Sequence, residues 1–136
     1  MDPLLRLADE RFVSLTTFRR SGQPVSTPVW VGRDGDALVV LTPAGSGKVK
    51  RLRDDTRVEV RPCGRFGAVE DGAVPVEGTA ELREQDADVR NARAVIRRAY
   101  PVESRVVLGI ERAVERLRGR PATPRLAVRI TAAEPA

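Results

Sequence analysis

The pattern of apolar and polar positions changes its period early in the chain. Residues 2–10 have helical spacing, with Asp2 placed to cap a helix and Pro3 at its first position. After them the period is two, and segments with Gly and Asp that suit tight turns separate the runs. Three β-rich runs result, at 11–18, 24–32 and 36–42. The pattern predicts a short helix followed by a three-stranded meander.

Two prolines mark the second of these runs. Pro24 and Pro28 lack the backbone N–H that a sheet ladder requires. We therefore expect this strand to lie at a sheet edge or an open mouth, where its backbone is available to a ligand.

The rest of the chain alternates between the two periods. A short helix is expected at about 46–54, and β alternation resumes in "RVEVRPC". A hairpin with a long final strand follows at 64–84, where Gly78 permits a bulge or a close approach. Two amphipathic helices between 85 and 118 are separated at Pro101, and "RLAVRIT" forms a last strand. Their apolar faces are Val89, Ala92, Val95, Ile96 and Ala99 in the first helix, and Val106, Val107, Ile110, Val114 and Leu117 in the second.

About six strands with few helices between them indicate a mainly β or α+β protein. An antiparallel barrel or half-barrel with flanking helices fits this order, and a doubly wound sheet does not. The length of 136 residues predicts one domain, 1–136, with a single core.

Composition limits the chemistry that the chain can perform. It contains no His and one Cys, so the common zinc sites, Cys/His dyads and Ser/His/Asp triads lack their parts. We expect no metal and no catalytic side chain, so any difficult chemistry must come from a cofactor.

Charge and the N-terminal segment indicate where the protein acts. The formal charge of +5 suggests anionic partners. Most cations are Arg scattered beside Asp or Glu, and aromatic residues are few, which disfavours nucleic-acid binding. The N-terminus resembles neither a signal peptide nor a membrane span, so we expect a cytoplasmic protein that binds no membrane.

The stretch "LTPAGSGKVKRLRDD" at 41–55 is the strongest candidate site. A strand enters a Gly/Ser turn and then a helix start, where unpaired N–H groups and the helix dipole attract anions. Thr42 and Ser46 offer hydroxyls there, and Lys48 and Arg51 project from one helical face. Spacing alone leaves two readings open, a phosphate site and a solvated basic helix.

Weaker candidates lie on the strands. Trp30 follows Pro28 and Val29. It is either a core anchor or part of an apolar surface against which a planar ring can pack. One hydroxyl of Thr16 and Thr17 should face inward, although ordinary strand threonines are the simpler reading. Cys63 has basic neighbours, yet a small buried role fits it better.

The order of these features matches a known family. "RFVSLTTFRRSGQPVSTPVWV", "DGDALVVLT", "SGKVKRLRDDTRVEVRPC" and "VEGTAELRE" resemble the flavin and deazaflavin oxidoreductases of the pyridoxamine 5'-phosphate oxidase-like superfamily, most closely its probable coenzyme F420-dependent group. The resemblance covers residues 11–83 and implies a six-stranded antiparallel split β-barrel that forms a homodimer. It also implies cofactor sites built from both subunits.

The resemblance assigns roles to the residues singled out above. It places the cofactor phosphate at Thr42, Ser46, Lys48 and Arg51, and the cofactor ring against Pro28, Val29 and Trp30. The implied activity is hydride transfer from reduced F420 to a small conjugated acceptor such as a quinone or enone.

Alternatives to this activity remain. FMN is the alternative cofactor, and a non-catalytic protein that binds a flavin, haem or acyl ligand is a third possibility. Lys50 and Arg53 favour F420 over FMN if they face its anionic tail. The chain lacks the C-terminal His of the enzymes that oxidise vitamin B6, so that reaction is not expected.

Overall fold

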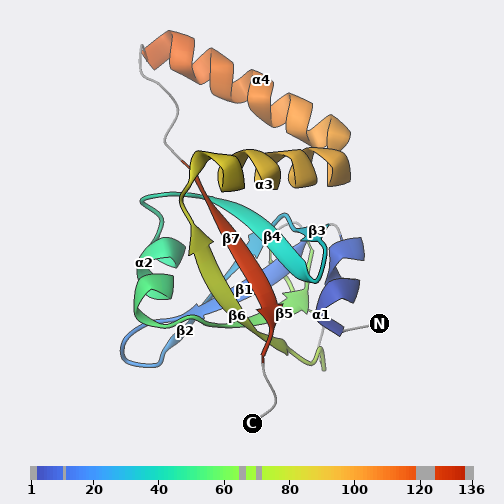
Figure 1. Ribbon diagram of the computed structural model, residues 1–136, viewed down its shortest axis with the longest axis vertical. Helices are drawn as coiled ribbons and strands as arrows, with labels where there is room; N and C mark the ends of the chain where they lie inside the picture. The colour runs from blue at the N-terminus through green and yellow to red at the C-terminus, as the bar shows by residue number, and fades with distance from the viewer. Residues whose placement is uncertain (1–2, 11, 65–66, 70–71, 119–124, 134–136) are drawn as a thin grey trace.

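The alternating runs of the sequence build one antiparallel sheet. The computed structural model describes residues 3–10, 12–64, 67–69, 72–118 and 125–133, and within them the sheet has seven strands in the order β2-β1-β5-β6-β7-β4-β3 (Figure 1). The strands are β1 (Val13–Phe18), β2 (Pro24–Val29), β3 (Gly32–Asp34), β4 (Ala37–Pro43), β5 (Arg57–Pro62), β6 (Val76–Arg83) and β7 (Arg125–Ala132). The mainly β or α+β class with an antiparallel half-barrel and flanking helices is confirmed.

The sheet has one strand more than expected, and the predicted meander is wrong. The run at 24–32 divides in two, so that β2 pairs with β1 while β3 pairs with β4 at the opposite end of the sheet order. The other neighbour of β4 is β7, from the end of the chain. Pairing between distant strands has no local signature, which is why the pattern of one segment could not reveal it.

The phenol of Tyr100 hydrogen-bonds to the backbone at the point where the run at 24–32 divides. The backbone N–H of Val31 donates to the hydroxyl of Tyr100 at 3.2 Å, and the Val31 carbonyl lies 3.2 Å from the same oxygen. The ring of Tyr100 stacks on Trp30, with centroids 4.8 Å apart and planes at 9°. The strand therefore breaks at 30–31, where a side chain satisfies backbone groups that the ladder leaves unpaired.

The concave side of the sheet encloses the main hydrophobic core. At one point β6 approaches its neighbours too closely for a side chain: a Cβ on Gly78 would lie 2.9 Å from the Ile130 Cγ2 and 3.3 Å from the Val58 Cγ2. The expected close approach at Gly78 is confirmed. The core consists of Leu4, Leu7, Val13, Leu15, Val31, Leu38, Val40, Leu52, Val58, Val60, Ala80, Val128 and Ile130.

Helices surround the sheet. The expected first helix is α1 (Pro3–Arg6) followed by a 3-10 turn at Leu7–Asp9, and its predicted cap Asp2 lies outside the described residues. The others are α2 (Gly47–Asp54), α3 (Asp86–Ala99) and α4 (Pro101–Arg118). Among the described residues, no helix is both long enough and apolar enough to span a membrane.

The two C-terminal helices differ in how they bury their apolar faces. Helix α3 lies against β3, β4 and β7 and buries Ala92, Val95 and Ile96, whereas Val89 is half-buried and Ala99 is exposed. Helix α4 lies on the far side of α3 from the sheet (Figure 1). Its predicted apolar face is largely open to solvent, with Val106, Ile110 and Leu117 exposed; the side chains of Val107 and Val114 lie outside the described part.

Candidate anion-binding site

Helix α2 begins in a network of hydroxyl groups. Ser46 is its N-cap, with extended backbone, and the Ser46 Oγ accepts a hydrogen bond from the Val49 N–H at 3.4 Å. The buried Thr42 Oγ1, at the end of β4, lies 3.0 Å from the Ser46 Oγ. These two predicted site residues therefore meet at the helix start, where first-turn N–H groups have no intrahelical partner.

Lys48 reaches from α2 to the edge strand β2. Its Nζ donates to the Thr27 Oγ1 at 3.2 Å, and the side chain is half-buried. Burial lowers the pKa of the Lys48 ammonium from its ordinary value, and the positive charge of Arg51 lowers it further. An ammonium in this position therefore lacks compensating negative charge.

Arg51 reaches from the same helix to β1. Its Nε donates to the fully buried Thr17 Oγ1 at 2.6 Å. The guanidinium lies over the helix start, so close to Gly47 that a Cβ on that residue would be 2.7 Å from the Arg51 Nη1. Burial lowers the pKa of Arg51, and the charge of Arg19 contributes in the same direction. Lys48 and Arg51 thus span the β1–β2 pair from one helix.

Among the described residues, no carboxylate pairs with these two cations. Within the described residues, neither Lys48 nor Arg51 has an ion-pair partner, and each donates instead to a neutral threonine hydroxyl. Cations that are partly removed from water and donate to neutral hydroxyls have the charge and the donor groups to hold an anion.

The other basic residues of the helix are arranged differently. Arg53 is paired with Glu84 at 2.6 Å, while Lys50 is exposed. Arg53 is therefore not free to bind the anionic tail of F420, because its guanidinium is already paired with Glu84. Of the two cations that favour F420 over FMN in the sequence, Lys50 remains.

The predicted ring-supporting residues are not all on the side of β2 that faces Lys48. In the register of β1 and β2, Thr27 lies opposite Leu15 and Val29 opposite Val13, and both partners belong to the core. Val29 therefore shares the face of Thr27. Pro28 points to the other face, where its ring lies 3.5 Å from the position that a Gly67 Cβ would occupy.

Trp30 lies beyond the end of β2. Its ring stacks on Tyr100 and so packs against the end of α3. This contact matches the anchor reading of Trp30, and support of a cofactor ring by Pro28, Val29 and Trp30 remains a prediction.

Three residues near the site were missed or undervalued in the sequence. The sequence favours an ordinary strand threonine at Thr17 and gives no separate signal for Thr27 or Arg19. Hydroxyls facing inward on two paired strands could have drawn attention to Thr17 and Thr27. Only the position of α2 on these strands shows that they meet cations.

The remaining candidates show no sign of reactive chemistry. Thr16 and Ser26 hydrogen-bond to each other at 2.6 Å across β1 and β2. Cys63 is half-buried, and burial raises the pKa of its thiol, which disfavours the reactive thiolate. Among the described residues, no cluster of three or more His, Cys, Asp or Glu side chains could hold a metal ion.

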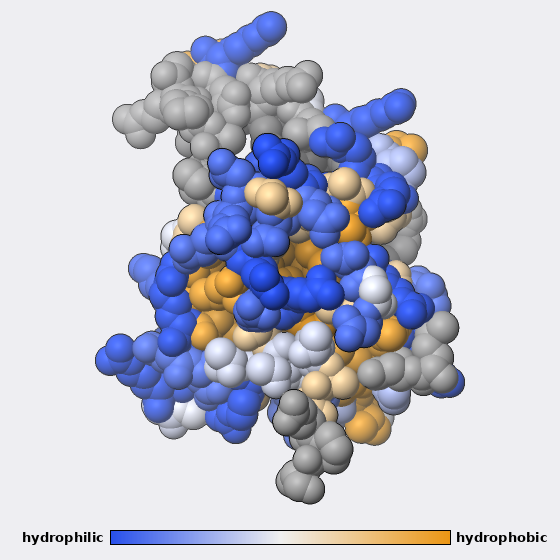
Figure 2. Space-filling view, viewed as in Figure 1, coloured by the Kyte–Doolittle hydropathy of each residue, from blue (hydrophilic) through white to orange (hydrophobic). Residues whose placement is uncertain are grey.

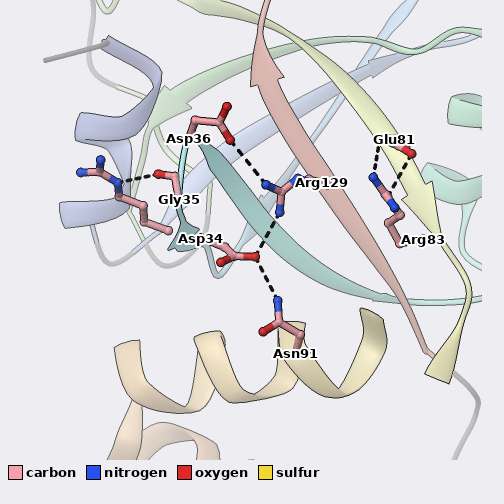
Figure 3. Close-up of polar contacts among 8 residues, drawn as sticks. Asp34, Gly35, Asp36, Glu81, Arg83, Asn91 and Arg129 are labelled. Carbon is pink, nitrogen blue, oxygen red and sulfur yellow. Dashed lines mark hydrogen bonds and ion pairs between the residues drawn. The ribbon is translucent and has the colours of Figure 1, made fainter. Parts of the chain in front are cut away.

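A second polar cluster lies between α3 and the convex side of the sheet (Figure 3). Arg129 on β7 donates to Asp34 at 3.0 Å and lies 3.5 Å from Asp36, while Asn91 on α3 donates to Asp34 at 2.9 Å. Hydrophilic side chains occupy the middle of this face, with apolar surface beside them (Figure 2). A cavity of about 310 Å³ is lined by Asp34, Val39, Arg83, Asp88, Asn91, Ala92, Ala127 and Arg129.

Comparison with known proteins identifies the family of the chain. The family profile described as pyridoxamine 5'-phosphate oxidase matches residues 4–134. The chain therefore belongs to the pyridoxamine 5'-phosphate oxidase family. No curated protein matches the sequence.

Solved structures agree with this assignment at the level of the fold. The chain is similar to the conserved hypothetical protein Rv2991 from Mycobacterium tuberculosis, with 23% identity, a TM-score of 0.66, and coverage of 94% of this chain and 76% of that one. It is also similar to HutZ, described as a haem storage protein, from Vibrio cholerae, with 11% identity, a TM-score of 0.66 and coverage of 93% and 84%. A protein described as an F420 reductase has 14% identity, a TM-score of 0.60 and coverage of 98% and 96%.

Proposed function

We propose that this protein is a coenzyme F420-dependent oxidoreductase that transfers a hydride from the reduced cofactor to a small conjugated acceptor such as a quinone or enone. The observation that carries the proposal is the pair Lys48 and Arg51, which start from one helix and donate to hydroxyls on β2 and β1, with no ion-pair partner in the part of the chain that the structure describes. The sequence resemblance and the fold shared with an F420 reductase support it.

The donor set fits the phosphate end of such a cofactor. Lys48 and Arg51 supply charge, Ser46 and Thr42 supply hydroxyls, and the start of α2 supplies backbone N–H groups. The bound cofactor supplies the hydride chemistry. The protein holds the anionic end, orients the ring along the β2 edge and excludes water. Orientation of this kind can lower a barrier by several kcal/mol without an acid or base, and by on the order of 7–11 kcal/mol in the most favourable cases.

FMN is the alternative cofactor. Both candidates carry a phosphate that Lys48 and Arg51 can hold, and the pairing of Arg53 with Glu84 removes one reason to prefer the longer anion. The lack of any His argues against a histidine-ligated haem, although proteins that bind haem share the fold.

Titration with purified F420 and with FMN tests the proposal. Binding is followed through Trp30 fluorescence, because Trp30 is the only tryptophan of the chain and directly follows β2, the strand that Lys48 contacts. We expect Lys48→Ala and Arg51→Ala each to weaken binding by about 1–3 kcal/mol, as expected when one charge-assisted phosphate contact is lost.

A matched control comes from the same helix. Arg53→Ala removes a cation that is already paired, so it should leave both affinities unchanged. If Lys48→Ala and Arg53→Ala had equal effects, the basic helix would be a solvated surface and the proposal would fail. Rapid-mixing oxidation of the bound reduced cofactor by a set of quinones then separates an enzyme from a carrier protein.

We also propose that the protein acts as a homodimer, as the resemblance implies. The position of β2 at a sheet edge supports this, because the side of the site beyond that strand is open to a second copy. Sedimentation equilibrium should give twice the mass of the chain, and a monomer at micromolar concentration would contradict this part of the proposal.

A further inference from the structure

The cavity between α3 and the convex side of the sheet has an apolar floor of its own. Val39, Ala92 and Ala127 form a buried cluster that is separate from the main core, and Leu41 packs against it. In the sheet register Ala127 lies between Leu41 on β4 and Arg83 on β6. The two alanines leave room between helix and sheet, and the resulting volume of about 310 Å³ is at the lower end of the range for small-molecule sites.

One wall of this cavity is already complete. Asp34 accepts hydrogen bonds from Arg129 at 3.0 Å and from Asn91 at 2.9 Å, so that β3, β7 and α3 are joined there (Figure 3). Because each of these polar groups has a partner, we expect this wall to keep its shape when a ligand enters. It defines the cavity and leaves the recognition of a ligand to the other polar groups.

Two further charged groups line the cavity and do not pair with each other. The Arg83 Nη2 donates to the Glu81 Oε2 at 3.1 Å, on the other side of β7 from Asp34 (Figure 3). The buried Arg83 Nε lies 3.0 Å from the Glu81 Oε1 but makes no hydrogen bond in the described structure. Asp88, half-buried in the first turn of α3, has neither a hydrogen bond nor an ion pair within the described residues.

These two groups require opposite charges in a ligand. The Asp88 carboxylate can accept hydrogen bonds from an ammonium group, and the Arg83 guanidinium can donate to a carboxylate. The Glu81 side chain is 61% exposed, so its pair with Arg83 is weak. A ligand carboxylate that meets the guanidinium in bidentate geometry can replace Glu81 and also satisfy the Nε. A single molecule with an ammonium and a carboxylate therefore satisfies both groups.

We propose that this cavity is a binding site for a small zwitterion, an α-amino acid with a short aliphatic side chain. The ammonium pairs with Asp88 and the carboxylate with Arg83. The aliphatic side chain packs on Ala92 and Ala127 in the floor. None of these residues belongs to the anion-binding site at the start of α2, so this inference is independent of the proposed function.

Three related molecules test the two charged contacts separately. L-Valine has both charged groups, its methyl ester lacks the carboxylate, and isovalerate lacks the ammonium. Binding of each to the full chain is measured by NMR titration at constant ionic strength and at about pH 6, where the amines are protonated. We expect L-valine to bind about tenfold more tightly than either analogue, because each analogue loses one charge-assisted contact.

Substitutions at the two groups should give matching losses. Asp88→Asn should weaken L-valine by about tenfold and leave isovalerate unchanged, and Arg83→Gln should weaken L-valine equally and leave the methyl ester unchanged. Asp86→Asn is the control, because this exposed carboxylate belongs to the same helical turn and does not line the cavity. It should change none of the affinities. Circular dichroism of each variant checks that the fold is retained.

Two results would overturn this site. If the wild type bound the three molecules equally, or did not bind L-valine at millimolar concentrations, the two charged groups would not recognise a zwitterion. If Asp88→Asn and Asp86→Asn had equal effects, α3 would act only through its net charge. Neither result concerns F420 or FMN, whose binding is tested through Lys48 and Arg51, so each proposal can fail while the other stands.

Discussion

Arg129 and the pair Lys48 and Arg51 lie in two polar clusters of the described structure, which differ in what faces the cations. On the convex side of the sheet, Arg129 meets Asp34 and Asp36. At the start of α2, Lys48 and Arg51 donate to the hydroxyls of Thr27 and Thr17, and neither is paired with a carboxylate of the described segments. Both clusters are partly buried and both join distant parts of the chain.

This difference separates a cluster that joins elements of the fold from one that we propose binds an anion. A partly buried cation that faces a carboxylate contributes to joining the elements that carry the two groups. A partly buried cation that faces no carboxylate destabilises the fold until a ligand supplies the missing negative charge. Unpaired cations of this kind are expected at binding sites, where the needs of function oppose stability.

The largest expected effect comes from breaking the paired cluster. Arg129→Ala leaves Asp34 with Asn91 alone and should lower the free energy of unfolding by about 1–2 kcal/mol, because a half-buried carboxylate loses its cation. Urea denaturation measures the loss. Arg57→Ala is the control, since its pair with Asp55 involves an exposed Arg and should change the free energy of unfolding much less.

Removing charge from the unpaired cluster should have the opposite sign. Lys48→Met keeps an unbranched chain and removes an uncompensated cation, so the ligand-free protein should be stabilised by about 0.5–1 kcal/mol. Thermal unfolding at neutral pH measures this gain, and a variant less stable than the wild type would show that the ammonium contributes to the fold.

The pH dependence of that gain follows from the Lys48 pKa. The pKa in the folded protein lies below the ordinary 10.5, so as pH rises towards 10.5 the folded state loses this proton before the unfolded state does. Wild-type stability relative to Lys48→Met should therefore rise across this window. The difference between the two proteins should be largest at neutral pH and shrink as the solution becomes alkaline.

A smaller effect is expected from anions in solution. Phosphate should raise the Tm of the wild type by an amount equivalent to about 0.5–1 kcal/mol near its Kd or slightly above, because it binds the folded protein only. Chloride at equal ionic strength is the control. The effect should be absent in Lys48→Ala and retained in Arg129→Ala, and a uniform response of all three proteins would mean that the two clusters do not differ.

The smallest expected effect concerns the backbone beneath Arg51. Gly47→Ala places a methyl group where the Arg51 guanidinium lies, so the side chain must shift. Phosphate affinity should fall by about twofold to fivefold, equivalent to about 0.4–1 kcal/mol. Gly45→Ala is the control, because a Cβ there meets nothing within 4 Å.

Local patterns predicted the elements well. The period of two identified β1, β2 and β4, the cap at Ser46 and the apolar spacing identified α2, and the prolines placed β2 at an edge. The candidate residues Thr42 and Ser46 also meet as expected, because they are close in sequence and one turn joins them.

Contacts between distant segments could not be predicted in this way. The division of the run at 24–32 depends on Tyr100, and the partners of Lys48 and Arg51 depend on how α2 lies on β1 and β2. The apolar spacing of α4 identified a helix and gave no information about what covers it, and Val106 and Ile110 are exposed. Periodicity shows which side of an element is apolar, whereas its neighbour is set by the whole fold.

The hydroxyl of Tyr100 has a consequence for how the protein opens. It ties the end of α3 to the backbone at Val31, between strands that lie at opposite ends of the sheet order. Separation of α3 from the sheet must therefore release the amide of Val31 to solvent. Hydrogen exchange at that amide should follow the detachment of the helical layer, and Tyr100→Phe should let the amide exchange independently.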